Sequence, residues 1–355
     1  MSKPRVGVIG AGSWTVSSHL PNLARRADEL EFVGIARKGP ELLHRIAAEF
    51  GFPLATEDYR DVLDAGVDLV IVASPSGLHY DHTRAALEAG AHVLVEKPVT
   101  IDPAEAWQLV ELAEAHGRHL LVSFGWNYRP MVVAAKELMD DAGIGEVEQV
   151  SISMASVTRE LLSNTGDYPD ADPATAPESR TWTDPTLSGG GYGQAQLSHA
   201  LGLALWLTGL RGEEAFAFMS APLDAPVELH DAIAMRFDNG AIGTMSGGSC
   251  HLGANGNKHQ LEVRAIGSEG QLHVDVEREL VWLWRADGLE ERLAVEDGDG
   301  AYDCDGPVQT LVDLALGKDA AIRSPGELGA RTVELLDAAY RSAATGRTAA
   351  VYSHG

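Results

Sequence analysis

The chain has 355 residues, a length that favours two domains over one. Its 27 Lys and Arg stand against 52 Asp and Glu, a formal net charge of −25, which argues against binding to nucleic acid or to an anionic membrane surface. With 45% hydrophobic residues and only two cysteines, the composition excludes a disordered chain and a disulfide framework.

The first third of the chain alternates short apolar runs with helical patterns. Asp102 is placed to cap the last of these helices and Gly117 to end it. This βαβα order predicts a doubly wound parallel sheet, an α/β domain over residues 1–125. The predicted strands are 5–9, 31–36, 69–73, 92–95 and 120–123, and the predicted helices are 17–26, 40–50, 81–89 and 103–116.

From residue 126 onward the pattern changes to hairpins with tight turns such as Asp238-Asn239-Gly240, and only two helices are predicted, at 194–207 and 326–345. We therefore expect an α+β domain over residues 126–355, with a large, open, mostly antiparallel sheet. Residues 157–193 lack periodicity, and we interpret them as a loop that covers a pocket. The predicted strands are 147–156, 215–220, 233–237, 241–246, 261–266, 271–276, 280–285 and 291–295.

A glycine-rich turn, Gly10-Ala11-Gly12-Ser13-Trp14-Thr15, lies directly after the first predicted strand and before a helix. Two glycines let the backbone approach a pyrophosphate, and the helix N-terminus supplies N–H donors. Thr15 stands where the usual dinucleotide fingerprint has a third glycine. The pattern predicts a dinucleotide site, with a plain glycine-rich turn as the alternative.

The end of the second predicted strand indicates which dinucleotide binds. A carboxylate there would hydrogen-bond the ribose hydroxyls of NAD, but the chain has Arg37 and Lys38. Two cations suit a 2′-phosphate and favour NADP(H). The alternative is NAD, with Arg37 stacked on the adenine.

Two further segments carry residues suited to proton transfer. The strand at 92–95 ends in Glu96-Lys97-Pro98, where Lys97 can orient a substrate hydroxyl and where desolvation would lower its pKa. Residues 189–193 form a glycine-rich loop that we expect to pass close to a ligand, and the helix after it carries His199, a natural general base. A surface lysine and a structural histidine are the alternatives.

In this order, these landmarks resemble the Gfo/Idh/MocA family of sugar and cyclitol oxidoreductases. The resemblance covers nearly the whole chain and includes Ser74-Pro75-Ser76 with His79, and Gly143–Val147. It implies an N-terminal Rossmann domain that binds NADP(H) or NAD. The implied cofactor-binding residues are Gly10, Gly12, Ser13, Trp14, Thr15, Arg37, Lys38, Ser74, Pro75, Ser76, His79, Glu96 and Lys97.

The same resemblance implies that Lys97 is catalytic and hydrogen-bonds the reacting oxygen, that Glu96 lies by the nicotinamide ribose, and that His199 is the proton acceptor. The family usually has an Asp four residues before this His, but Ala195 stands here, which argues against inositol as substrate. Arg129 could bind an anionic or polyhydroxylated substrate or pair with an acid. The candidate substrate-binding residues are Tyr128, Arg129, Arg159, Trp182, Tyr192, Gln196 and His199.

Three functions compete. The first is an NAD(P)-dependent oxidoreductase acting on a ring hydroxyl or ketone of a pyranose sugar, glycoside or cyclitol. The second is a redox-neutral glycosidase that uses bound NAD for transient oxidation and elimination, with Tyr192 or Tyr128 as base. The third, a non-catalytic dinucleotide-binding regulator, is disfavoured because Lys97 and His199 are both present.

The expected surroundings are simple. The N-terminus lacks a signal-peptide pattern and no apolar run reaches ~18 residues, so we expect a cytoplasmic protein without a membrane partner. We expect a small carbohydrate substrate and no metal. The open sheet needs one face covered, which predicts a homodimer or homotetramer.

Overall fold

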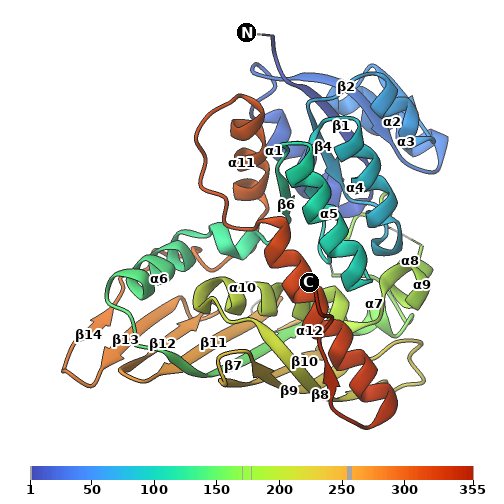
Figure 1. Ribbon diagram of the computed structural model, residues 1–355. Helices are drawn as coiled ribbons and strands as arrows, with labels where there is room; N and C mark the ends of the chain where they lie inside the picture. Colours follow the sequence, from blue (N-terminus) through green and yellow to red (C-terminus); the bar gives the residue numbers. More distant parts are fainter. Residues whose placement is uncertain (1, 170, 177, 254–257, 355) are drawn as a thin grey trace. The chain divides into compact units, whose positions relative to one another are not determined.

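The computed structural model describes residues 2–169, 171–176, 178–253 and 258–354. The chain divides into two compact units, both drawn in Figure 1. Unit 1 comprises Met1–Gly125, Asp170–Thr181 and Asp303–Ala330, and unit 2 comprises Trp126–Pro169, Trp182–Tyr302 and Arg331–Gly355. Unit 1 therefore takes in two segments from beyond residue 125.

Unit 1 is built on a six-stranded sheet in the order β3-β2-β1-β4-β5-β6, and every neighbouring pair is parallel. The strand order reverses between β1 and β4, which confirms the predicted doubly wound sheet. β4 is buried along its whole length, as expected for a strand covered on both faces. The strands are β1 (Arg5–Ile9), β2 (Glu31–Ala36), β3 (Leu54–Thr56), β4 (Leu69–Val72), β5 (His92–Val95) and β6 (Leu120–Val122).

Helices cover both faces of this sheet (Figure 1). Leu23, Ile46 and Leu311 share one hydrophobic core with the strands, so α1, α2 and α11 lie on the same face, while α3, α4 and α5 pack on the other. The Asp102 carboxylate accepts a hydrogen bond from the Ala104 N at 2.7 Å and caps α5 as predicted. The helical segments are η1 (Thr15–His19), α1 (Leu20–Ala24), α2 (Pro40–Phe50), α3 (Tyr59–Asp64), η2 (Ser76–Leu78), α4 (His79–Glu88), α5 (Pro103–Ala115) and α11 (Asp305–Ala315).

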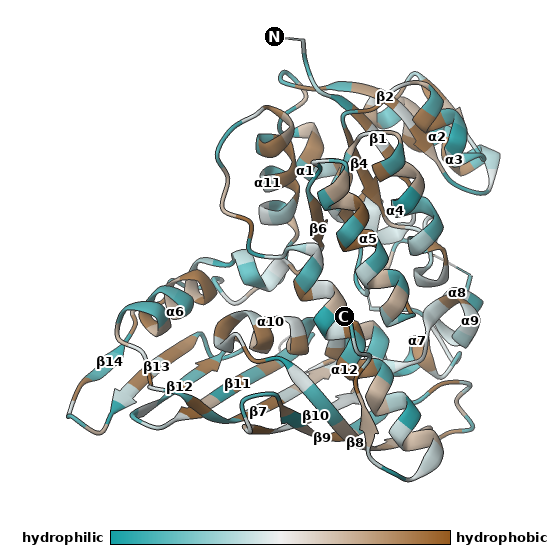
Figure 2. Cartoon of the chain, in the orientation of Figure 1, coloured by the Kyte–Doolittle hydropathy of each residue, from teal (hydrophilic) through white to brown (hydrophobic). Residues whose placement is uncertain are grey.

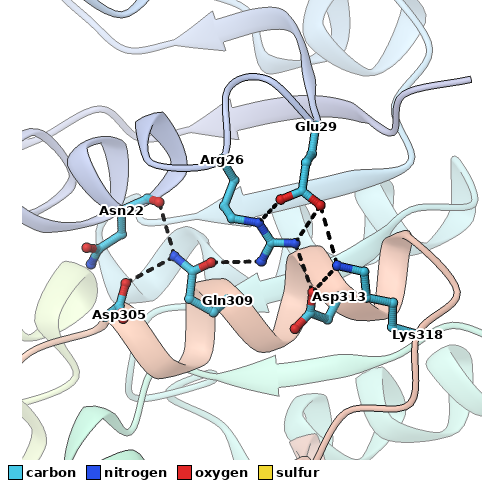
Figure 3. Close-up of polar contacts among 7 residues, drawn as sticks. All are labelled: Asn22, Arg26, Glu29, Asp305, Gln309, Asp313 and Lys318. Carbon is cyan, nitrogen blue, oxygen red and sulfur yellow. Dashed lines mark hydrogen bonds and ion pairs between the residues drawn. The ribbon is translucent and has the colours of Figure 1, made fainter.

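A polar network fixes α11 to the segment around α1, as Figure 3 shows. The Arg26 guanidinium donates to the Gln309 Oε1 and to the Asp313 Oδ1, both at 2.9 Å, and also pairs with Glu29. Lys318 lies 3.1 Å from Asp313 and completes the network. A helix from the last sixth of the chain is thereby held on the N-terminal sheet.

Unit 2 contains a nine-stranded sheet in the order β14-β13-β12-β11-β7-β10-β9-β8-β15. Only the β7–β10 pair is parallel among the described pairs of this sheet, which confirms a mostly antiparallel sheet. The strands are β7 (Val147–Ser156), β8 (Gly212–Ser220), β9 (His230–Phe237), β10 (Ile242–Ser249), β11 (His259–Gly267), β12 (Gly270–Asp275), β13 (Leu280–Arg285), β14 (Glu290–Arg292) and β15 (Ala349–Ala350).

One face of this sheet carries α6, α10 and α12 (Figure 1). Hydrophobic and hydrophilic residues alternate along its strands, as Figure 2 shows, and on the face away from the helices Phe218 is 70% exposed and Ile242 55%. The helical segments are η3 (Gly125–Tyr128), α6 (Pro130–Asp141), α7 (Arg159–Leu162), α8 (Arg180–Thr183), α9 (Pro185–Ser188), η4 (Gly193–Leu197), α10 (Ser198–Thr208) and α12 (Gly326–Thr345).

The prediction of only two helices after residue 126 was wrong. It missed α6 and α11, and the stretch at 157–193 contains the short helices α7, α8 and α9. α6 begins with a short apolar run, Met131–Ala135, which periodicity alone does not distinguish from a strand. In the part of the chain that the structure describes, no helix is long and apolar enough to cross a bilayer.

Candidate active site

The glycine-rich turn of unit 1 has the shape of a phosphate-binding loop. Gly10 has a φ of +94°, and a Cβ there would lie 2.3 Å from the Ser74 N, so only glycine fits against the end of β4. At Gly12 a Cβ would meet nothing within 4 Å, which leaves room for a ligand close to the backbone. The Thr15 Oγ1 donates to the Gly10 carbonyl at 2.8 Å and closes the turn where a third glycine is usual.

The turn leads directly into helical structure that includes Ser13, exposed Trp14 and η1. The first N–H groups of a helix have no partner within the helix and are suited to bind phosphate. Together with the open position at Gly12, they show that these residues fit the pyrophosphate of a dinucleotide.

Two cations follow β2, and a carboxylate from the end of the neighbouring strand β3 lies beside them. The Arg37 Nη1 donates to the Ala11 carbonyl at 3.1 Å, which ties this strand end to the glycine-rich turn, and the Lys38 Nζ donates to the Glu57 carbonyl at 3.1 Å. Burial, with a smaller contribution from Arg45, lowers the Arg37 pKa. The Glu57 carboxylate accepts from the Gly39 N at 2.6 Å. Sequence reasoning missed Glu57 because it follows the short strand β3.

His79 connects the ends of two neighbouring strands. Its ring nitrogens lie 2.7 Å from the Pro98 carbonyl and 2.7 Å from the Ser74 carbonyl. Burial lowers the pKa of this imidazole. Pro75 and Ser76 continue from Ser74 into η2, so His79 holds this segment beside the Glu96-Lys97-Pro98 turn.

Glu96 is the centre of a polar cluster at the end of β5. The His19 Nε2 lies 2.7 Å from the Glu96 Oε1, and the Ser123 hydroxyl bonds the same carboxyl. Burial is the largest single effect and opposes ionisation of Glu96, but His19, Lys97 and Ser123 together outweigh it and hold the pKa of Glu96 below its usual value. Burial lowers the pKa of the Lys97 ammonium, and the Glu96 carboxylate opposes that shift. The cluster thus favours an ionised Glu96 beside a lysine that releases its proton more easily.

Sequence reasoning did not find His19 or Ser123. His19 lies one helical turn beyond Thr15, and Ser123 follows β6, which is the strand beside β5. The signal available was topological, because the carboxyl ends of adjacent parallel strands meet at one edge of the sheet.

In unit 2, His199 lies in the first turn of α10 within an aromatic cluster. Its ring centroid is 5.4 Å from that of Trp126 and 5.0 Å from that of Tyr302. Trp126 also contacts His259, with centroids 5.5 Å apart, and the His259 Nε2 lies 3.2 Å from the Tyr168 hydroxyl. Sequence reasoning found His199 but missed Trp126, His259 and Tyr302, which come from three separate segments.

One proposed substrate contact needs correction. Tyr192 is fully buried, and its hydroxyl donates to the Met154 carbonyl and accepts from Ser156, both at 3.1 Å. It therefore faces β7 as a packing residue, and burial raises its pKa, which keeps the hydroxyl protonated and leaves no phenolate to act as a base. The Arg129 guanidinium donates to the Asp299 carbonyl at 3.0 Å and to the Gly298 carbonyl at 2.8 Å.

The other candidates are distributed over four short helical segments. Tyr128 lies in η3 two residues after Trp126, and Gln196 lies in η4 three residues before His199, so both adjoin the aromatic cluster in sequence. Arg159 and Trp182 lie in α7 and α8 and are half-buried. Gln194, which precedes Ala195, is buried.

The glycine-rich loop at 189–193 also differs from expectation. A Cβ at Gly190 would lie 2.3 Å from the Tyr340 hydroxyl, and one at Gly191 would lie 2.1 Å from the Glu228 carbonyl. These glycines are required by neighbouring protein atoms rather than by a ligand.

Among the described residues, one group has donor atoms close enough for a metal ion. Glu262, His273 and Asp275 lie on β11 and β12, and one donor atom of each lies within 4.8 Å of the others. The Arg278 guanidinium contacts Asp275 at 2.5 Å and already supplies a positive charge there.

Two family models match this chain. Residues 4–124 match a family model described as an oxidoreductase family with an NAD-binding Rossmann fold, and residues 132–273 match the GFO/IDH/MocA C-terminal domain. The structure of a levoglucosan dehydrogenase in complex with NADH and levoglucosan superposes with a TM-score of 0.77 at 22% identity, covering 99% of this chain and 100% of that one. At this identity the likeness shows the fold alone.

Two curated relatives act on sugars by name. D-xylose 1-dehydrogenase (NADP(+)) 2 of Haloferax volcanii is 34% identical over 134 residues, which is 38% of this chain and 41% of that enzyme. Levoglucosan dehydrogenase of Pseudarthrobacter phenanthrenivorans is 24% identical over 290 residues, which is 73% of this chain and 69% of that enzyme. The match to the xylose dehydrogenase therefore spans less than half of that enzyme's length.

Proposed function

Because this chain belongs to the Gfo/Idh/MocA family of oxidoreductases, we propose that it is a dehydrogenase or reductase of sugars. The proposed reaction interconverts a ring hydroxyl and a ketone of a pyranose sugar, glycoside or cyclitol. The observation that carries the proposal is the Glu96–Lys97 pair at the carboxyl end of β5, held by His19 in the same unit as the glycine-rich turn.

A bound nicotinamide dinucleotide would supply or accept the hydride, with Gly10, Gly12 and the helix start after them holding its pyrophosphate. Lys97 donates a hydrogen bond to the reacting oxygen and stabilises the charge that develops on it. The ionised Glu96 keeps the ammonium of Lys97 oriented. His199 accepts the hydroxyl proton during oxidation and returns it during reduction.

Sugars are the proposed substrates for two reasons. The cluster of Trp126, Tyr302 and His259 around His199 combines apolar rings with polar atoms, and its Tyr302 and His259 are partly exposed, a combination that suits a pyranose. The two curated relatives also act on sugars by name. Ala195 removes the carboxylate that a cyclitol dehydrogenase of this family would use, so a pyranose or glycoside is favoured over inositol.

For the cofactor we propose NADP(H) in preference to NAD. Arg37 and Lys38 end β2, and one relative is named for NADP(+). The nearby Glu57 carboxylate accepts from the Gly39 N, and a carboxylate at this place would favour NAD, because it can bind ribose hydroxyls. If Arg37 binds the 2′-phosphate as proposed, Arg37→Ser should weaken NADP binding far more than NAD binding.

We also propose that the protein forms a homodimer or homotetramer through the sheet face of unit 2 that carries no helices. Phe218 and Ile242 are exposed on that face, and large apolar side chains at such positions favour association.

The experiment that tests the function uses the purified protein. Any bound nucleotide is released by denaturation and identified by mass spectrometry. The protein is then assayed at 340 nm with NAD and NADP against D-xylose, levoglucosan, myo-inositol and an aryl glucoside.

Sugar-dependent nucleotide reduction that is lost in Lys97→Ala but kept in Lys3→Ala, an exposed lysine of the same unit, would support the proposal. Cleavage of the glycoside with no net change at 340 nm would instead support the redox-neutral glycosidase. Nucleotide binding without turnover of any carbohydrate would support the regulator.

A further inference from the structure

The carboxylate of Glu228, between β8 and β9, binds the backbone of the glycine-rich loop. The Gly191 N donates to its two oxygens at 2.8 and 2.9 Å, and the Gly193 N donates to Oε1 at 3.1 Å. Between these two, the Tyr192 N donates to the Glu228 carbonyl at 3.0 Å. Three consecutive backbone N–H groups thus end on one residue.

Tyr340, from α12, completes this anchor. Its hydroxyl donates to the Glu228 Oε1 at 2.5 Å and accepts from the Gln194 N at 3.2 Å. The four N–H groups from Gly191 to Gln194 are the ones that precede or begin η4, and they lack partners within the helix. A carboxylate at this position also lies at the positive end of the helix dipole.

The glycines of the loop make this approach possible. A Cβ at Gly193 would lie 2.7 Å from the Tyr340 hydroxyl, and those at Gly190 and Gly191 would come closer still to Tyr340 and Glu228. The loop and its two anchoring side chains therefore form one fitted assembly, and η4 continues from it without a break into α10, which carries His199.

We propose that Glu228, supported by Tyr340, is a positioning residue that fixes the start of the η4–α10 helix and so the place of His199. This inference rests on the proposed role of His199 as proton acceptor. It also extends that role, because Glu228, which no sequence motif marks, would hold His199 in line with the substrate. Since a misplacement of ~1 Å can reduce turnover ~10²-fold, the effect should appear in kcat.

The test compares Glu228→Ala, Glu228→Gln and Tyr340→Phe with the control Glu214→Gln, which removes a carboxylate paired with Arg236 on the same sheet. Amide hydrogen exchange is measured on a peptide covering residues 189–197. Dinucleotide affinity and, with the best sugar from the panel above, kcat and KM are measured in parallel.

The expected result is graded. Exchange in this peptide should rise most in Glu228→Ala, less in Glu228→Gln and Tyr340→Phe, and not at all in Glu214→Gln. The value of kcat should fall roughly 10- to 100-fold, most in Glu228→Ala and less in Glu228→Gln and Tyr340→Phe, with dinucleotide affinity unchanged. The partial rescue by Gln is expected because an amide retains one acceptor oxygen.

Exchange rates equal to those of Glu214→Gln would overturn the anchor, and an unchanged kcat despite faster exchange would overturn its link to His199. If the unmodified protein shows no sugar-dependent activity, the proposed function fails by itself, and the exchange rates still decide whether Glu228 fixes the loop.

Discussion

At the scale of single residues, this chain uses glycine for two different purposes. Gly10 is required because β4 leaves no room for a side chain, and Gly190 is required because Tyr340 fills the space beside it. Gly12 has open space instead. A sequence shows all three as the same letter, so their purposes could be separated only from the packing around them.

The difference between Gly10 and Gly12 gives the first prediction. Gly12→Val should leave the thermal stability of the protein nearly unchanged, because a Cβ at this position meets no atom within 4 Å, yet it should abolish dinucleotide binding by filling the ligand's place. Gly10→Ala should lower the free energy of unfolding by roughly 1–3 kcal/mol, since it adds backbone strain at positive φ and a contact with Ser74.

Isothermal titration with NAD and NADP, together with denaturant unfolding, measures both quantities. If Gly12→Val still binds the dinucleotide with the affinity of the unmodified protein, the assignment of this turn to the pyrophosphate is wrong.

Asp231 gives the second prediction, which concerns pH. It is buried on β9 without a hydrogen-bond partner in the described structure, and burial together with the nearby Glu228 raises its pKa to about 8. The folded state therefore retains a proton that the unfolded chain has already lost at pH 4–8. Because the folded state binds the additional proton, stability falls as pH rises through this interval.

Asp231→Asn should reduce this dependence, because an amide does not titrate, whereas the part due to Glu228, whose pKa burial also raises, should remain. Urea unfolding at pH 5, 6.5 and 8 should show a free energy of unfolding that declines with pH in the unmodified protein, by on the order of a few kcal/mol, and a flatter curve in the variant. The groups that face Asp231 are Glu228, Tyr192 and Tyr340, and the two tyrosines stay neutral over this range because their own pKa values are raised. Parallel curves for the two proteins would contradict the buried, protonated carboxyl.

At the scale of elements, sequence reasoning succeeded where periodicity was strong and failed where tertiary contacts decided. The bounds of β1, β2, α2, β5, β7, β13 and α12 agree with the predicted ranges. β3 and α3 were missed because each is too short to show a period. Of the candidate site, the glycine-rich turn, Lys97 and His199 could be proposed from motifs, whereas His19 and Glu228 act through partners 77 and 37 residues away.

α11 was also missed from the sequence, because its place depends on tertiary contacts, and it is the subject of the third prediction. Its apolar residues pack with the Rossmann core, and Arg26 links it to the segment after α1 through Gln309 and Asp313. The Arg26 side chain is largely buried, so Arg26→Ala removes the donor to the Gln309 Oε1 and leaves Asp313 with Lys318 as its partner. We expect the free energy of unfolding to fall by roughly 1–3 kcal/mol.

Arg60→Ala is the matched control, since that arginine pairs with Asp58 at an exposed position and its loss should cost about 0–1 kcal/mol. Thermal unfolding of both variants, with hydrogen exchange over residues 305–315, distinguishes them. Equal destabilisation by the two substitutions would show that the network in Figure 3 does not hold α11 in place.

At the scale of the whole molecule, the two sheets differ in how they are covered. The sheet of unit 1 has helices on both faces, whereas the sheet of unit 2 has them on one. One face of a nine-stranded sheet is a large surface to expose to water without helices. The strongly negative charge of the chain opposes nonspecific association through that face. The proposed pairing of copies through this face would bury this surface without nonspecific association.

The fourth prediction follows from that pairing. Replacing Phe218 and Ile242 by Lys puts two charges on the face without helices, where desolvating them on association is unfavourable. Light scattering after size exclusion should give a multiple of 37.8 kDa for the unmodified protein and a reduced mass for Phe218→Lys/Ile242→Lys, with dinucleotide affinity retained. Leu223→Lys, an exposed apolar residue in the connection between β8 and β9, should keep the original mass. A monomeric unmodified protein, or a double variant of undiminished mass, would rule out association through this face.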